Sequence, residues 1–168
     1  MKNLIRILES LAEVTGRVIA WGTLLMVLVT FAVVVLRYAL DTGRIAMQES
    51  ITYLHSLVFM LGAAYTLRHQ GHVRVDIFYQ KFSERGRAWV NLLGTLLLLF
   101  PMMSFIVWIS WEYVTESWKV MEGSREAGGL PGVFLLKTLL LLMPVAMMLQ
   151  GLALLLRSLQ IIRGDEHG

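Results

Sequence analysis

Residues 18–36 read VIAWGTLLMVLVTFAVVVL, nineteen consecutive residues without an ionisable side chain. A hydrocarbon core about 30 Å thick is crossed by roughly 20 helical residues at about 1.5 Å each, so this stretch is long enough to span a membrane. Its apolar residues are continuous and do not alternate with a period of two, which favours a helix over a barrel strand. The stretch is longer than the apolar region of a signal peptide, and no small-residue cleavage site follows it. We therefore interpret it as a retained transmembrane helix.

Three further stretches have the same character: residues 50–67, 88–111 and 138–156. They contain no charged side chain, and His55 is their only group that titrates near neutral pH. We predict an all-α integral membrane protein with a single membrane domain, residues 1–168. Its four transmembrane helices are expected at about 18–37, 49–68, 88–111 and 132–157.

The composition supports this class. Hydrophobic residues make up 57% of the chain and charged residues 16%, against roughly 45–50% and about 25% in soluble domains. The absence of cysteine excludes a disulfide scaffold, thiolate metal sites and thiol catalysis. The sequence also lacks phosphate-binding glycine loops, HExxH and a Ser/His/Asp set. We expect no enzymatic activity, no cofactor and no metal.

Short amphipathic helices are expected beside the spans. In residues 2–16, apolar side chains recur at helical spacing. This segment either lies in the membrane interface or extends the first span, and the sequence leaves both open. Apolar and charged residues also interleave in residues 73–82, which predicts a short surface helix between the second and third spans.

The distribution of basic residues predicts the orientation. With four spans, the two termini and the middle loop share one side of the membrane, and they hold ten lysines and arginines. The two opposite loops hold four and are net acidic. Because basic residues accumulate on the cytoplasmic side, both termini should be cytoplasmic. The formal net charge of +3 is then a topology signal and gives no reason to expect nucleic-acid binding.

Few polar side chains lie at membrane depth, where an unpaired ionisable group is costly. Glu49 stands at the outer start of the second span, where it is either solvated at a helix start or a polar anchor facing a partner helix. Lys137 lies about 9 Å into the last span, close enough to extend its ammonium outward or to pair with a carboxylate of a neighbouring subunit. His55 is expected to be a neutral, hydrogen-bonded histidine at a helix contact, because no second histidine at membrane depth could complete a haem site.

The order of several short motifs resembles a known family. They are Arg37-Tyr38, Met47-Gln48-Glu49-Ser50, Tyr53-Leu54, Gly62-Ala63-Ala64-Tyr65, His72-Val73-Arg74-Val75-Asp76, Trp111, Glu116-Ser117, Pro131, Lys137 and Leu149-Gln150-Gly151. Together with the four spans, they resemble the small permease subunit, DctQ-like, of tripartite ATP-independent periplasmic (TRAP) transporters. The resemblance covers nearly the whole chain.

The resemblance implies a three-part secondary transporter of the bacterial inner membrane. A periplasmic substrate-binding protein would deliver an organic acid, and a large permease subunit would move it by symport with sodium. The small subunit would stabilise the large one as part of its fixed scaffold. On this basis, candidate polar contacts with that subunit or within the membrane are Glu49, His55, Lys137, Arg37 and Gln150.

Two other classes of function remain open from the sequence. A membrane anchor for a redox enzyme would show haem absorbance through His55 and a ligand from a partner. A small transporter acting alone as an oligomer would move substrate in liposomes without other proteins. The scarcity of ionisable groups at the membrane midplane disfavours the second class.

Overall fold

The computed structural model of the protein describes residues 2–72 and 79–164, which fold into helices joined by short connections, with no strand among them. Four helical segments are long and apolar enough to cross a membrane. The predicted all-α class with four candidate spans is therefore confirmed. The predicted surface helix of residues 73–82 falls mostly on 73–78, which lie outside the described residues.

The first helix, α1 (Lys2–Ala39), is continuous over 38 residues. At about 1.5 Å per residue it is about 57 Å long. The N-terminal segment and the first predicted span therefore form one continuous helix, as the second of the two expectations has it. The buried residues follow one face of this extension and recur every three or four positions: Ile5, Leu8, Ala12, Gly16 and Ile19.

The second helix, α2 (Ile45–Arg68), returns antiparallel to α1 and packs along it. The third segment is built from α4 (Glu84–Gly94), the π-helical turn η1 (Thr95–Leu99) and α5 (Phe100–Lys119), which continue one another. In η1 the Phe100 amide bonds to the Thr95 carbonyl, one residue further back than in an α-helix. Pro101 follows immediately and has no amide hydrogen to donate. The wider turn accommodates this proline while the helix continues.

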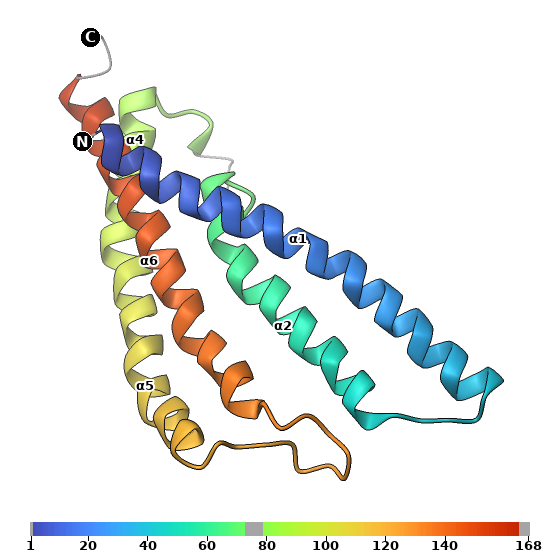
Figure 1. Ribbon diagram of the computed structural model, residues 1–168. Coiled ribbons are helices and arrows are strands. Elements are labelled where there is room, and N and C mark those ends of the chain that lie inside the picture. The colour runs from blue at the N-terminus through green and yellow to red at the C-terminus, as the bar shows by residue number, and fades with distance from the viewer. Residues whose placement is uncertain (1, 73–78, 165–168) are drawn as a thin grey trace.

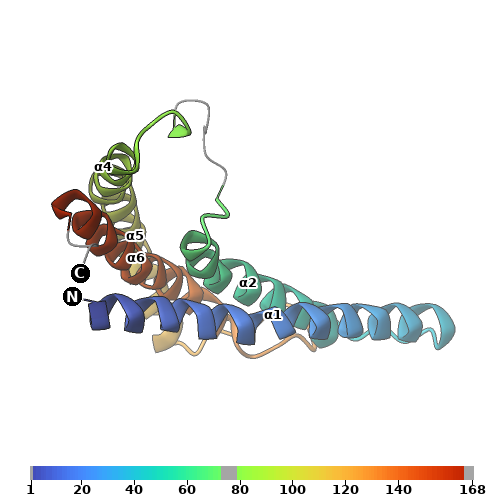
Figure 2. The same cartoon turned by 90° about the horizontal axis from the view of Figure 1, so that it is seen from above.

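The last helix, α6 (Val133–Arg163), packs against each of the others (Figure 1). Seen from above, α1 runs along one side of the molecule and α4 lies far from it (Figure 2). Gly164 ends α6 in the left-handed conformation, with φ of 78°, a backbone geometry that glycine adopts without strain.

The bundle has two ends. The terminal end is where α1 begins and α6 ends, and the loop end carries the α1–α2 and α5–α6 connections (Figure 1). Between the two ends, large apolar side chains face outward, for example Phe31 at 68% and Trp108 at 76% exposure. So much exposed apolar surface suits a lipid environment and would be a liability in water. The candidate polar sites therefore lie at the ends.

Candidate functional site

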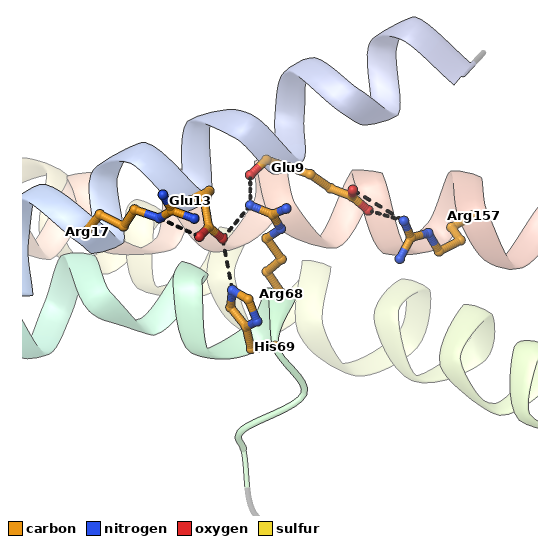
Figure 3. A network of polar contacts seen from close by, with 6 residues as sticks. All are labelled: Glu9, Glu13, Arg17, Arg68, His69 and Arg157. Carbon is orange, nitrogen blue, oxygen red and sulfur yellow. Dashed lines mark hydrogen bonds and ion pairs between the residues drawn. The ribbon is translucent and has the colours of Figure 1, made fainter.

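A network of charged side chains joins three helices at the terminal end (Figure 3). At its centre, the Glu13 carboxylate of α1 receives Arg68 Nη1 at 2.6 Å, Arg17 Nε at 2.8 Å and His69 Nε2 at 2.9 Å. Because a carboxylate only accepts hydrogen bonds, all three nitrogens donate to it. Glu13 thus ties α1 to the last turn of α2 and to the residue after it.

Glu9 extends this network to α6. Its carboxylate lies 2.9 Å from Arg157 Nη2, and its backbone carbonyl accepts a 2.7 Å hydrogen bond from Arg68 Nη1. Arg68 therefore bridges two successive turns of α1. The terminal network, defined as Glu9, Glu13, Arg17, Arg68, His69 and Arg157, holds the start of α1 against both neighbouring helices.

The helical spacing of the two glutamates explains the location of this network. Glu9 and Glu13 are four residues apart and so lie on the same face of α1. Their side chains are only 15% and 17% exposed, whereas that of Arg17 is 75% exposed. A largely buried carboxylate must be paired to be tolerated. The contacts with Arg68 and Arg157, which cross between helices, are therefore the ones on which the packing depends.

At the loop end, Glu49 fixes the long connection between α5 and α6. Its two carboxylate oxygens accept hydrogen bonds from the Ser124 hydroxyl and, at 2.6 Å, from the Leu130 backbone amide. Gly129 lies against this contact, since a Cβ added there would be 2.8 Å from Glu49 Oε1. Glu49 therefore makes its hydrogen bonds within its own chain and holds the α5–α6 connection against the start of α2.

Lys137 is held by a second loop-end contact. Its ammonium pairs with Glu122, which also accepts a 2.7 Å hydrogen bond from the Ser117 hydroxyl, and it lies 3.8 Å from the centroid of the Tyr113 ring. The Lys137 ammonium and then the Ser117 hydroxyl hold the pKa of Glu122 below its ordinary value. The lysine thus pairs within its own chain and joins α6 to the end of α5.

The other predicted site residues are not brought together. Arg37 is exposed near the end of α1. His55 is exposed on α2, where its ring stacks with Phe59 at a centroid distance of 6.2 Å. Its imidazole makes no hydrogen bond within the described residues, in contrast to the expected hydrogen-bonded histidine. Gln150 is buried in α6 and only 4% exposed.

The arrangement is suited to holding helices together. Across residues 2–72 and 79–164, no group of three or more histidine and acidic side chains is placed to hold a metal ion. Ion pairs join helices at the terminal end and hold Lys137 at the loop end, and the apolar stretches between the two ends carry no charged side chain.

Sequence reasoning missed the terminal network. A signal was present in the i, i+4 spacing of Glu9 and Glu13, which places two acidic side chains on one helical face. That pattern is equally typical of a solvated polar face, and the partners Arg68 and Arg157 lie on other helices. The network could therefore be recognised only once the packing was known.

The comparison with protein families agrees with this architecture. Residues 26–161 match the family model described as tripartite ATP-independent periplasmic transporters, DctQ component. Neither the comparison with curated proteins nor that with solved structures gives a match. The family match begins within the first candidate membrane helix and ends in the last turn of α6. It therefore includes residues from all four candidate membrane helices. The chain belongs to the DctQ family and is a small membrane component of a TRAP transporter.

Proposed function

We propose that this chain is the scaffold subunit of a sodium-driven transporter for organic acids. It would pack against the large permease subunit and stabilise it, while the large subunit carries the substrate and sodium. The observation that supports this role most directly is the segregation of charge. Residues 18–36, 50–67, 88–111 and 138–156 carry no charged side chain, and His55 is their only group that titrates near neutral pH. A subunit without charged side chains at the midplane lacks groups that could neutralise a sodium ion or a carboxylate substrate there.

The bundle itself supports a static role. The terminal network joins α1, α2 and α6, and the loop-end contacts join α2, α5 and α6. Contacts at both ends of the bundle hold the helices in fixed positions relative to one another. A scaffold needs this rigidity if the large subunit is to move against it.

Two exposed polar residues are proposed contacts with the large subunit. Arg37 and His55 both face outward from α1 and α2. Paired polar groups at the edge of an otherwise apolar surface would define where the two subunits meet. Glu49, Lys137 and Gln150, the other candidates, would act on the complex through the packing of the bundle. If alanine at both Arg37 and His55 leaves the yield of the complex unchanged, these two contacts do not exist.

The proposed topology places the terminal end in the cytoplasm and the loop end in the periplasm of a bacterial inner membrane. It rests on the excess of lysine and arginine on the side of the termini. The loop end would then face the periplasmic substrate-binding protein, and its acidic residues would attract that protein. We expect replacement of Glu112, Glu116 and Glu126 by glutamine to change uptake and its salt dependence. Glu122 is left intact because it holds Lys137.

The central test is a mild-detergent purification of the tagged chain from its native host, with mass spectrometry of the proteins that remain bound. One large polytopic membrane protein in near-equal amount would support the scaffold role. Uptake into liposomes should then require this chain, the large subunit, the binding protein and a sodium gradient together. Recovery of self-oligomers that transport alone would contradict the proposal. A haem or flavin enzyme in the eluate, with visible absorbance, would indicate a redox anchor.

A further inference from the structure

A cavity of about 180 Å³ lies where α1, α2 and α6 meet. Seven of its nine lining residues are apolar, among them Leu61 of α2 and Leu149 of α6. The other two are Gln150 of α6 and Thr15 of α1. On α1 the lining residues run from Leu8 to Thr15, at the same level along the helix as Glu9 and Glu13 of the terminal network.

The two polar side chains of this cavity are unsatisfied. Gln150 is only 4% exposed, and its Oε1 atom is buried without a hydrogen-bond partner. Within the part of the chain that the structure describes, the Thr15 hydroxyl also makes no hydrogen bond, although Thr30, Thr66 and Thr138 each bond to the carbonyl four residues earlier. Two helices therefore present polar groups without a hydrogen-bond partner to the same cavity.

Lipid cannot satisfy these groups. A buried amide without a hydrogen bond is destabilising, and hydrocarbon offers neither donor nor acceptor. The Gln150 carboxamide has an acceptor oxygen and an NH₂ group with two donor hydrogens. Rotation of the carboxamide by 180° about its terminal side-chain bond exchanges the positions of the oxygen and the NH₂ group. Gln150 can therefore pair with any small molecule that both donates and accepts.

Water meets these requirements. A water molecule needs about 10–15 Å³ of accessible volume and at least two polar partners, and a wholly apolar cavity stays dry. The volume here exceeds that minimum, and Gln150 and Thr15 supply the partners. We infer that this cavity binds ordered water, which joins Thr15 of α1 to Gln150 of α6.

Hydroxyl-radical footprinting tests this inference. X-ray irradiation converts water in place into radicals that modify the adjacent side chains, and mass spectrometry measures the rate at each residue. The full chain with its partner subunits in native membrane is irradiated. Leu61 of the cavity is compared with Leu57, one turn away on the same helix, which is 37% exposed and does not line the cavity.

We expect Leu61 to be modified several-fold faster than Leu57, although the Leu61 side chain is the less exposed of the two. Gln150→Leu should lower the Leu61 rate to that of Leu57. Thr15→Val, which keeps the shape of the side chain and removes only its hydroxyl, should lower it as well, and it supplies the answer if the first variant does not fold. Equal rates at the two leucines in the parent chain would overturn the inference. A fast Leu61 rate that both variants leave unchanged would also overturn it. The same holds for a fast rate that is seen in the isolated chain but lost in the complex, because a neighbouring subunit would then fill the cavity.

Discussion

Gly16 marks the closest approach of α1 and α2, and enlarging it should separate the two helices. A Cβ added at Gly16 would lie 2.6 Å from Tyr65 Cβ and still closer to the Tyr65 ring. The Tyr65 Cβ is fixed to its backbone, so turning the side chain cannot relieve this contact. Ordinary contact begins at 3.4 Å, which means that α1 and α2 must move apart by about 1 Å. Gly16→Ala thus strains the most extensive helix contact of the bundle.

The expected cost follows from this overlap. Forcing an extra carbon into a close-packed contact destabilises a protein by about 1–3 kcal/mol. For a chain of this length, each kcal/mol corresponds to about 2–4 °C in the melting temperature. We therefore expect Gly16→Ala to melt about 2–12 °C below the parent chain, measured by circular dichroism in one detergent. The separation also lengthens the contacts of the neighbouring Glu13.

Gly62→Ala provides the matched control. Gly62 also lies in a membrane-spanning helix, but a Cβ there would meet nothing within 4 Å. Alanine is preferred over glycine inside a helix by roughly 0.5–1 kcal/mol, so this variant should be as stable as the parent or slightly more so. A Gly16→Ala chain that melts together with Gly62→Ala would refute the close approach of α1 and α2 at Tyr65.

Two further predictions concern the charged contacts. Arg68→Met should lower the melting temperature more than Arg17→Met does. Arg68 is largely buried and contacts Glu13 on another helix, whereas Arg17 is mostly exposed. Equal effects of the two variants would show that the contact between helices adds nothing to stability. The pKa of Glu122 is lowered from its ordinary value of 4.5. Its pairing with Lys137 therefore contributes stability that is fully present above pH 4.5, as long as the lysine is protonated, and that is lost as the pH falls through the lowered pKa. Thermal melts at decreasing pH should therefore show a loss of stability below 4.5 that Glu122→Gln lacks, and parallel profiles for the two chains would contradict this linkage.

The helical architecture could be predicted because it depends on hydrophobicity summed over consecutive residues. Each apolar stretch is as long as the hydrocarbon core is thick, and no tertiary contact is needed to recognise it. The continuity of α1 was harder to predict. A segment with apolar residues at helical spacing can lie in the interface or pack against other helices, and only the burial of Ile5, Leu8 and Ala12 by α2 and α6 decides between them.

The polar contacts were harder to predict for a related reason. The depth of Lys137 follows from its distance along α6, but its partner Glu122 belongs to a connection whose path the sequence does not reveal. The same applies to Glu49, whose partners Ser124 and Leu130 lie 75 and 81 residues away. Spacing along a helix predicts where a side chain lies in the membrane. It does not predict which part of the chain comes back to meet it.

The central position of α6 has a consequence for biosynthesis. This helix packs against every other helix, yet it is the last of them to leave the ribosome. While α1, α2, α4 and α5 are already in the membrane, the faces that they turn toward α6 have no partner, and Glu9 still lacks Arg157. The nascent chain must therefore wait as an α1–α2 hairpin and a separate α4–α5 helix, exposed to quality-control proteases, until α6 packs against both. A premature stop anywhere before Val133 should accordingly yield a rapidly degraded product, not a smaller stable one.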